Sequence, residues 1–404
     1  MATDTPPVER DRDLLRRLSL WTLLRGALLT SLVLGLIIGL HAYLATRLVD
    51  GLGIEGPLRT AGWALFAILF ASIPGGFWAG RRAPSPLQKA MLWTAHVWIG
   101  LFWIFLCTVA LLDLGRAVTG WILTLSARPS LGWTPNWSLA AWLVGAGVAL
   151  GAVLIARGRP KVRRVTVPVE GLGEGLRGLR IVQVSDIHIG QTLGREFLQR
   201  MVERVNALEP DVVAVTGDLV EGFAHRIRDQ VQPLSGLRGK LGVFYVPGNH
   251  EFYYGGAAWM AEVARLGPTV LENAHRIVER GGARLAVAGV SDHDGGHFGE
   301  RHACRPDLAL AGVPGDVPRV LLAHQPRSAL LLKGLRVDLQ LSGHTHGGQI
   351  FPFNLFVRLQ QPAVAGLDVV NGVRVYTHSG TGYWGPPMRL GAPPEIAVLT
   401  LVPA

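Results

Sequence analysis

Four long apolar stretches before residue 157 constrain this 404-residue chain more than any other feature of its sequence. A helix needs about 20 consecutive apolar residues to cross the hydrocarbon core of a bilayer. The stretches approach that length at about 22–46, 60–79, 91–113 and 138–156. We therefore predict an all-α transmembrane region of about four helices over residues 22–157, preceded by a basic leader at residues 1–21.

The Lys and Arg residues between these stretches predict the orientation in the membrane. Four arginines lie in the leader, three basic residues lie between the second and third stretches, and five follow the fourth, whereas the other two connections have two each. We expect a multi-pass protein of the plasma membrane with both termini on the cytoplasmic side. A twin-arginine export signal at Arg16 and Arg17 is the competing interpretation, but the apolar run is too long for it and three further stretches follow.

The basic excess of the chain belongs to this membrane half. Residues 1–164 contain 17 Lys and Arg against 7 Asp and Glu, whereas residues 165–404 contain 22 of each. A neutral C-terminal domain gives no support for a nucleic-acid partner. Two cysteines are too few for a disulfide framework, and the sequence leaves the oligomeric state open.

The pattern changes after a segment at residues 158–174 that we interpret as a basic linker and a first strand. Short buried strands are predicted at 179–186, 211–218, 241–249, 284–290, 319–324, 337–343, 373–379 and 395–401. Amphipathic helices are predicted at 195–208 and near 257–266. This alternation indicates a layered α/β domain over residues 175–402, with its ligands at the carboxyl ends of the strands.

Polar residues of one chemical kind follow successive strands of this domain. They are Asp186, His188, Asp218, Asn249, His250, His324, His344 and His346. A single Asp after a strand is most often a helix cap, but independent caps and surface histidines have no reason to recur at successive strand ends. Carboxylate, amide and imidazole ligands without thiolates suit two divalent ions such as Mn, Fe or Zn.

The motifs D-x-H, G-D, G-N-H-E and G-H-T-H-G-G-Q, in this order, resemble the calcineurin-like metallophosphoesterase superfamily. The extended last motif is similar to that of a branch whose members often carry N-terminal membrane spans. This resemblance implies a four-layer αββα sandwich. It also implies that Asp186, His188 and His346 bind one metal, that Asn249, His324 and His344 bind the other, and that Asp218 bridges the two.

The resemblance implies the reacting groups as well. Two metal ions lower the pKa of a bridging water, so that hydroxide attacks the phosphorus and no covalent intermediate is needed. His250 would protonate the leaving oxygen, or orient the phosphate without a proton transfer. Glu221, at a position where family members more often have Asp, would be directed toward His250. Asn249 and Arg389 are candidate contacts to the substrate phosphate, although Arg389 fits a salt bridge equally well.

The leading hypothesis is a membrane-anchored phosphoesterase that hydrolyses a phosphodiester or pyrophosphate bond, with a lipid or lipid-linked molecule as one candidate substrate. The alternative substrate is a soluble nucleotide or phosphomonoester. A third hypothesis makes the chain a membrane scaffold without turnover. A second metal-like sequence, DHDGGH at residues 292–297, is interpreted as a polar loop, because the main site already has its ligands.

Overall fold

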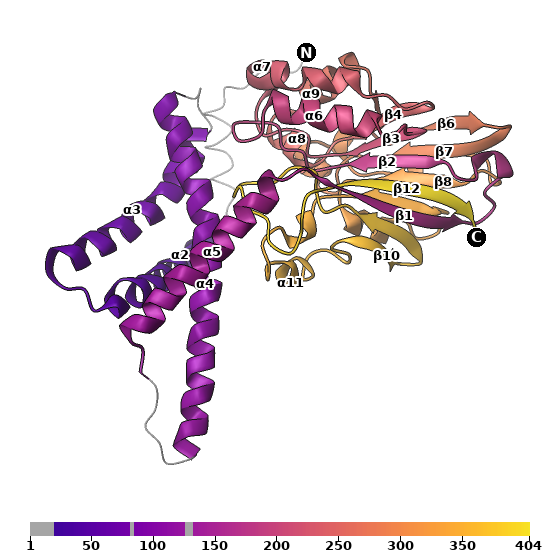
Figure 1. Cartoon of the computed structure of the whole chain (residues 1–404). Coiled ribbons are helices and arrows are strands. Elements are labelled where there is room, and N and C mark those ends of the chain that lie inside the picture. Colours follow the sequence, from indigo (N-terminus) through magenta and orange to yellow (C-terminus); the bar gives the residue numbers. More distant parts are fainter. Residues whose placement is uncertain (1–19, 81–84, 126–131) are drawn as a thin grey trace. The chain divides into compact units, whose positions relative to one another are not determined.

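A computed structural model describes residues 20–80, 85–125 and 132–404 of the chain (Figure 1). The chain divides into two compact units. The first comprises Met1–Phe77 and Leu101–Gly147, and the second comprises Trp78–Gly100 and Val148–Ala404. Several basic residues used to predict the membrane orientation lie outside the described residues: Arg10, Arg12, Arg16, Arg17, Arg81, Arg82 and Arg128.

Within the described residues, four helices are long and apolar enough to cross a membrane. They are α2 (Leu20–Leu48), α3 (Gly56–Gly80), α4 (Pro86–Leu125) and α5 (Pro135–Arg157). The helical form follows from the composition, because a chain in hydrocarbon must satisfy its backbone hydrogen bonds within each segment. Helix α4 has 40 residues and continues twelve residues beyond the predicted stretch, since Gly115 and Gly120 are tolerated inside it.

A polar cluster ties the helices of the first unit together. Asp113 of α4 accepts hydrogen bonds from the Tyr43 hydroxyl (2.7 Å) and from Nε of Arg47 (2.8 Å), both on α2. Nearby, Trp142 of α5 donates to the carbonyl of Leu48 (3.0 Å). These contacts stabilise the packing of α2 against α4 and α5, because an unpaired charge at such a place would cost several kcal/mol.

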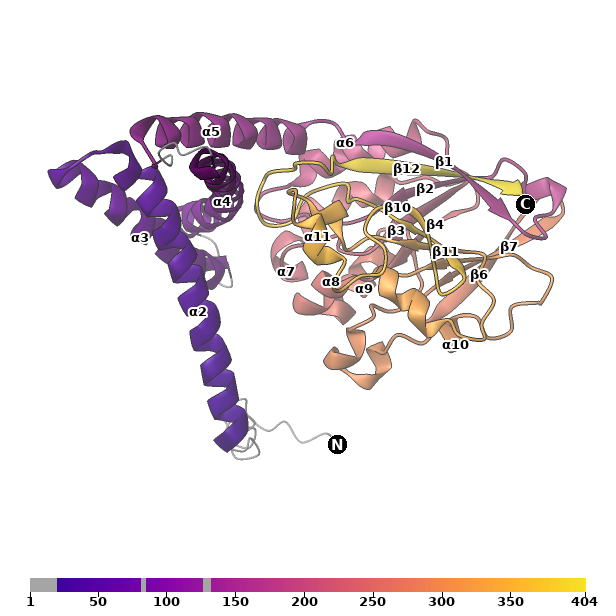
Figure 2. The ribbon, with the colours of Figure 1, turned by 90° about the horizontal axis from the view of Figure 1, so that it is seen from below.

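Two six-stranded mixed sheets form the centre of the second unit (Figure 2). The first contains, in spatial order, β1 (Lys161–Val169), β12 (Glu395–Pro403), β2 (Arg180–Val184), β3 (Val212–Thr216), β4 (Gly242–Val246) and β5 (Thr269–Val270). The second contains β10 (Gly366–Val370), β11 (Val373–Thr377), β9 (Leu339–Ser342), β8 (Arg319–Leu322), β7 (Ala283–Gly289) and β6 (Ala274–Arg280).

Short helices connect and cover these strands. The α-helices are α6 (Arg195–Asn206), α7 (Ala224–Ile227), α8 (Asn249–Tyr253), α9 (Gly256–Arg265), α10 (Pro306–Ala309) and α11 (Asn354–Val357). The 3-10 helices are η1 (Asp50–Leu52), η2 (Glu174–Leu176), η3 (Arg228–Gln230), η4 (Gln232–Gly236), η5 (Gly295–Phe298), η6 (Glu300–His302), η7 (Pro326–Leu331) and η8 (His346–Gly348).

Alternation along the central strands divides the apolar side chains between separate cores. In β3, Val213 and Val215 pack with α6 and α9 on the outer face of the first sheet. Val212 and Ala214 point the other way, into the core between the two sheets. A third core on the outer face of the second sheet includes Ala309 of α10. The layers are therefore helix, sheet, sheet and helix, and the predicted αββα fold class is confirmed.

Candidate metal centre

Eight predicted polar residues converge where parallel strands of both sheets end. Asp186 and His188 follow β2, Asp218 follows β3, and Asn249 and His250 follow β4 in the first sheet. His324 follows β8, and His344 and His346 follow β9 in the second. Because the carboxyl ends of parallel strands meet at one edge of a sheet, the two face-to-face sheets bring both sets of loops together.

One group of possible metal ligands consists of Asp186, His188 and His346. Nε2 of His188 lies 3.0 Å from Nε2 of His346, and Nε2 of His346 lies 3.4 Å from Oδ1 of Asp186. All three side chains are buried. Two imidazole nitrogens and a carboxylate oxygen thus point at one another away from solvent.

The second group consists of Asp218, His324 and His344. Nε2 of His324 lies 3.2 Å from Oδ2 of Asp218, and Nδ1 of His344 lies 3.3 Å from Nε2 of His324 and 3.0 Å from Oδ1 of Asn249. Asp218 also approaches the first group, with its Oδ2 3.9 Å from Nε2 of His188. Asp218 thus belongs to the second group and also lies within 4 Å of a histidine of the first.

The imidazoles are oriented by contacts on the opposite ring nitrogen. Nδ1 of His188 lies 2.7 Å from Oε1 of Glu221, and Nδ1 of His324 lies 2.8 Å from the carbonyl oxygen of Thr216. When these nitrogens donate their protons, Nε2 of each ring keeps a lone pair directed into the site, which is the usual arrangement for a metal-binding histidine.

This donor set fits divalent metal ions. The buried carboxylates of Asp186 and Asp218 repel each other, and a cation bound between them would turn this repulsion into attraction. Nitrogen and carboxylate oxygen ligands without thiolate suit Mn, Fe and Zn. Burial raises the pKa of Asp186, although the nearby His324 opposes this shift.

The backbone at these positions is unusual. Asp186, His188, Asp218, His344 and His346 all have φ between 51° and 69°, in the left-handed region. Only a few per cent of residues other than glycine adopt this conformation, and such residues concentrate at functional sites. Close approach of the loops also requires glycine: a Cβ on Gly343 would lie 2.2 Å from Oδ2 of Asp186.

His250 and Glu221 form a third group of possible metal ligands together with His188. Nδ1 of His250 is 2.6 Å from Oε1 of Glu221, and its Nε2 is 3.8 Å from Oδ2 of Asp218. Burial lowers the pKa of His250, but the carboxylates of Asp218 and Glu221 outweigh it and raise the pKa to about 9. The imidazole therefore holds a proton at neutral pH.

Glu221 contacts two histidines with one oxygen. Oε1 lies close to both His188 and His250, and Oε2 accepts a hydrogen bond from the Tyr254 hydroxyl (3.1 Å). Burial raises the pKa of Glu221, but the two histidines prevail and hold it at about 2. The structure thus directs Glu221 toward His250, as the sequence suggested, and adds the contacts to His188 and Tyr254.

Glu251 is the last residue of the G-N-H-E motif, and the sequence analysis assigned no role to it. Its fully buried carboxylate accepts hydrogen bonds from the backbone N–H groups of Asp218 (3.0 Å), Leu219 (2.8 Å) and Gly248 (2.6 Å). Burial and the nearby Asp218 charge raise the pKa of Glu251 to about 7. Glu251 fastens the loop after β3 to the loop after β4.

Arg389 does not face the site as a substrate contact would. It is completely buried, and its guanidinium donates to the carbonyl oxygens of Gly382 (2.9 Å), Ser379 (2.7 Å) and Ala392 (2.9 Å). Nη2 also lies 3.1 Å from Nδ1 of His346. The substrate-binding role predicted for Arg389 is therefore corrected, because its guanidinium N–H groups bind backbone carbonyls and the ring of His346 inside the protein.

The DHDGGH segment forms a polar network behind the site. Asp292 accepts hydrogen bonds from Nε2 of Gln325 (3.0 Å to each oxygen), and Nε of Arg327 donates to Oε1 of Gln325 (2.6 Å). Over the ranges that the structure describes, the metal-type groups contain no residue of this segment. Asp292 of this segment thus holds the side chain of Gln325, the residue that follows His324.

The fold and the clustered ligands define the class to which this chain belongs, the calcineurin-like phosphoesterase family. The sequence profile of that family matches residues 179–348, and the resemblance predicted from the motifs is confirmed.

Sequence comparison also identifies individual proteins that are similar to this chain. A "transmembrane protein with metallophosphoesterase domain" of Bos taurus is 37% identical over 333 residues, which cover 76% of this chain and 73% of that protein. The protein of the same description in Danio rerio is 38% identical, over 65% of this chain and 62% of that protein. An uncharacterized metallophosphoesterase of Helicobacter pylori strain J99 is 40% identical, over 61% of this chain and 65% of that protein. The chain thus spans less than two thirds of the last two relatives.

Proposed function

We propose that this protein is a membrane-anchored phosphoesterase that uses two divalent metal ions to hydrolyse a phosphodiester or pyrophosphate bond of a lipid or lipid-linked substrate. The observation that carries the proposal is the close approach of the groups of possible metal ligands, in which Asp218 lies within 4 Å of His188 and His324 and Glu221 contacts His250. Metal ions of the Mn, Fe or Zn type, when bound there, would act as Lewis acids on the phosphoryl oxygens and on a water molecule.

The ligands are assigned by their grouping. Asp186, His188 and His346 would hold one ion, while Asn249, His324 and His344 would hold the other. Asp218 lies within 4 Å of a histidine of each group, which supports a bridging role. Oδ1 of Asn249 already faces His344, so both side chains would contact the same ion. A substrate phosphate bound to that ion would then lie next to Asn249.

His250 is the proposed proton donor. In the reaction, a water molecule would first lose a proton to the solvent; the resulting hydroxide oxygen would form a bond to phosphorus, the bond from phosphorus to the leaving oxygen would break, and the Nε2 proton of His250 would go to that oxygen. Glu221 keeps the imidazole protonated and fixes its orientation through Nδ1. The indole ring of Trp384 stands 5.9 Å from the His250 ring, which places an apolar wall beside the leaving group.

The position of the site on the sheet supports a substrate in the membrane. Strand β12 runs parallel to β1, with Lys161 opposite Glu395, and antiparallel to β2, with Ala397 opposite Gln183. The start of β1 therefore lies at the edge where β2 ends and the ligands follow. Only three residues separate the end of α5 from Lys161, so this edge begins within about 14 Å of the transmembrane helix.

Exposed apolar residues next to the ligand loop give further support. Phe351, Phe353, Leu355, Phe356 and Leu359, which follow the loop of His344 and His346, are each at least half exposed. Apolar side chains that remain exposed together usually mark an interaction surface. At the site edge of the domain, they suit contact with the acyl part of a lipid substrate.

The proposed location is the cytoplasmic face of the plasma membrane, on the basis of the Lys and Arg distribution. A reporter fused after Ala404 tests this location. An enzyme such as alkaline phosphatase, which is active only outside the cytoplasm, should stay inactive in the fusion, and an active fusion would reverse the orientation.

Hydrolysis of an aryl phosphodiester by the full chain in detergent tests the activity, with Mn²⁺ or with a chelator. We expect turnover that requires the metal and is lost in Asp218→Asn. Asp368→Asn is the matched control, because Asp368 is exposed on the edge strand β10. Equal turnover in Asp218→Asn and wild type would contradict the proposed role of Asp218. No turnover by folded, metal-loaded protein on a broad panel of esters would contradict the proposal and favour a scaffold.

The substrate class needs a separate comparison. The values of kcat/KM for a lipid diester in mixed micelles and for soluble nucleotides should favour the lipid. Substitution of Phe353 and Phe356 by Ser should then lower kcat/KM for the lipid and leave the soluble ester unchanged. A preference for nucleotides or phosphomonoesters would support the alternative function.

A further inference from the structure

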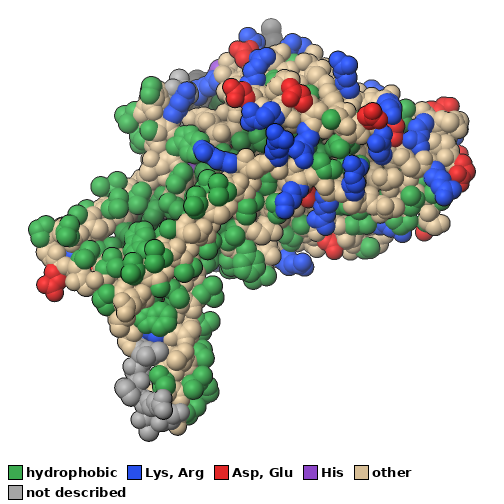
Figure 3. All heavy atoms as spheres, viewed as in Figure 1, with side chains coloured by type: hydrophobic (Ala, Val, Ile, Leu, Met, Phe, Trp, Pro, Cys, Tyr) green, Lys and Arg blue, Asp and Glu red, His purple; other side chains and the backbone are tan. Residues whose placement is uncertain are grey.

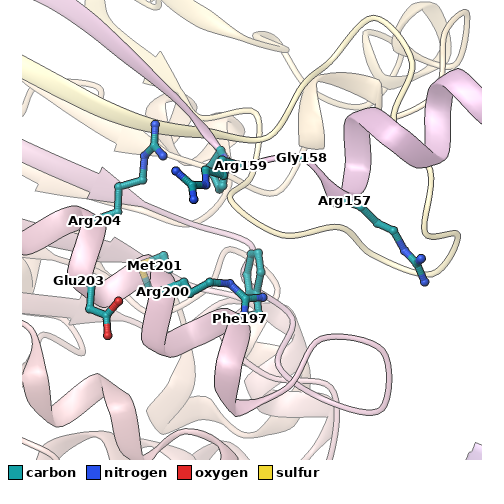
Figure 4. Close-up of a pocket in the computed structure, with 9 residues that line it drawn as sticks. Arg157, Gly158, Arg159, Phe197, Arg200, Met201, Glu203 and Arg204 are labelled. Atoms are coloured by element: carbon teal, nitrogen blue, oxygen red, sulfur yellow. The ribbon is translucent and has the colours of Figure 1, made fainter.

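A basic pocket away from the metal centre lies where the last transmembrane helix enters the catalytic domain (Figure 4). It has a volume of about 450 Å³ and is lined on one side by residues 157–160 and on the other by α6. The lining includes Arg157, Arg159, Arg200 and Arg204 but only one carboxylate, Glu203. Four cations against one anion make it a pocket for a negatively charged group.

These cations have few partners within the protein. Arg200 has one ion pair, with Glu196 at 3.8 Å, and both side chains are largely exposed, so the pair contributes little. Nε of Arg204 is buried and has no hydrogen-bond partner among the described residues. A buried donor of a charged group without an acceptor is costly, and it identifies a place where an anionic ligand would be stabilised.

Glu203 does not neutralise the pocket. Its Oε1 accepts a hydrogen bond from Nε2 of Gln199 on the outer side of α6 (2.9 Å). Figure 4 shows its carboxylate directed away from Arg159, whereas Arg159 and Arg204 extend from opposite walls into the same space. The space-filling view also shows Lys and Arg side chains gathered over α6 and the beginning of β1 (Figure 3).

The pocket lies at the height of lipid headgroups. Leu154 and Ile155 are exposed apolar residues of the transmembrane helix α5, and Arg157 ends that helix two residues later. The boundary between hydrocarbon and water therefore falls within one helical turn of the pocket. The ring of Phe197 and the side chain of Met201 add apolar surface to its wall.

The two walls are held in place by packing. Ala156 of α5 belongs to the same buried core as Leu198 and Val202 of α6. The carbonyl of Ala152 accepts a hydrogen bond from the backbone N–H of Arg389 (2.9 Å). The end of α5 is thus fixed to the catalytic domain, so the backbone positions that carry the arginines are held on both walls of the pocket.

From this geometry we propose that the pocket binds the phosphate headgroup of an anionic phospholipid from the leaflet around α5. Arg159, Arg200 and Arg204 contact the phosphate, Arg157 lies at the rim, and Phe197 and Met201 contact the first part of the acyl chains. This binding does not depend on the phosphoesterase activity. It would fix the catalytic domain against the membrane surface through the same helix that anchors it.

Calorimetric titration of the full chain in neutral detergent tests the site, with EDTA present so that the metal centre contributes nothing. The probe is a short-chain phosphatidylglycerol. Phosphatidylcholine of the same chain length supplies the chains without net charge, and inorganic phosphate supplies the charge without chains. We expect phosphatidylglycerol to bind more tightly than either.

The double variant Arg200→Gln/Arg204→Gln should bind phosphatidylglycerol about 30-fold more weakly, because a basic residue near the membrane surface contributes about 1 kcal/mol to anionic lipid binding. The control is Arg238→Gln/Arg276→Gln, which removes the same charge from exposed positions elsewhere in the domain and should bind like wild type. Both variants should unfold at the wild-type temperature.

Other results would overturn the proposal. Equal affinity for the two lipids would show that charge is not recognised. Unchanged affinity in the α6 double variant would place the binding outside this pocket. Inorganic phosphate that binds as tightly as phosphatidylglycerol, and is lost in the same variant, would make this a site for soluble anions.

Discussion

Replacement of Arg389 by Met separates a structural role from a substrate contact. The unbranched methionine fills most of the same volume, so the main change is the loss of the guanidinium. Its hydrogen bonds to the carbonyls of Gly382, Ser379 and Ala392 disappear together. The side chain is fully buried, so water cannot replace the lost donors without opening the protein.

The magnitude follows from the three carbonyls. A buried polar group left without a partner costs about 1–3 kcal/mol, so the free energy of unfolding should fall by at least about 3 kcal/mol. For a domain of this size, 1 kcal/mol shifts the midpoint of thermal unfolding by about 2–4 °C. We therefore expect a midpoint at least about 6 °C below that of the wild type.

Thermal unfolding of the full chain in detergent, followed by intrinsic fluorescence, measures this shift. Arg238→Met is the matched control, because Arg238 is exposed, and its midpoint should stay within about 1 °C of wild type. Steady-state kinetics complete the test. A variant of wild-type stability with a raised KM would refute the reasoning and return Arg389 to the substrate site.

Further predictions concern side chains around the metal centre and one thiol. Glu251→Ala removes the acceptor of three backbone N–H groups and should lower the unfolding free energy by about 3 kcal/mol or more, with a smaller loss in Glu251→Gln by the same thermal assay. His250→Asn should reduce kcat by about 10²–10⁴-fold for an alkyl ester, but much less for a 4-nitrophenyl ester, whose leaving group needs no proton; equal losses would exclude His250 as the acid. Glu221→Gln should lower the pH above which kcat declines, because it removes a charge that favours protonated His250, and an unchanged profile would contradict this. Burial raises the pKa of Cys304 to about 12, so in a Cys107→Ala background its alkylation at pH 8 should be on the order of 1,000-fold slower than in denaturant.

The sequence predicted the centre of the fold because the central strands are buried on both faces. Such strands appear as continuous apolar runs, like VVAVT of β3, and are bounded by polar residues. The edge strands β6 and β10 were missed. In these strands, exposed side chains such as Arg276, Glu279 and Asp368 interrupt the apolar pattern, so a half-exposed strand resembles a loop.

The metal-type residues could be predicted because each lies within a short motif directly after a strand. The supporting residues could not. Arg389 depends on carbonyls at four separate positions, and Glu251 depends on N–H groups of a loop about 30 residues away. Such contacts form only when loops from separate parts of the chain pack together, so a local sequence pattern does not show what these side chains contact.

Five predicted ligands have a left-handed backbone conformation, which explains why the buried side chains of Glu251 and Arg389 lie behind their loops. A residue other than glycine in this conformation costs about 1–2 kcal/mol, and Asp and His tolerate it better than most residue types. All five are Asp or His, so their identity suits both metal binding and the strained loops. The loops would still relax without restraint. Glu251 holds the N–H groups of the loop that carries Asp218, and Arg389 holds the carbonyl and ring of His346. The hydrogen bonds of the buried Glu251 carboxylate and Arg389 guanidinium therefore help to hold the loops in conformations that bring the predicted ligands together.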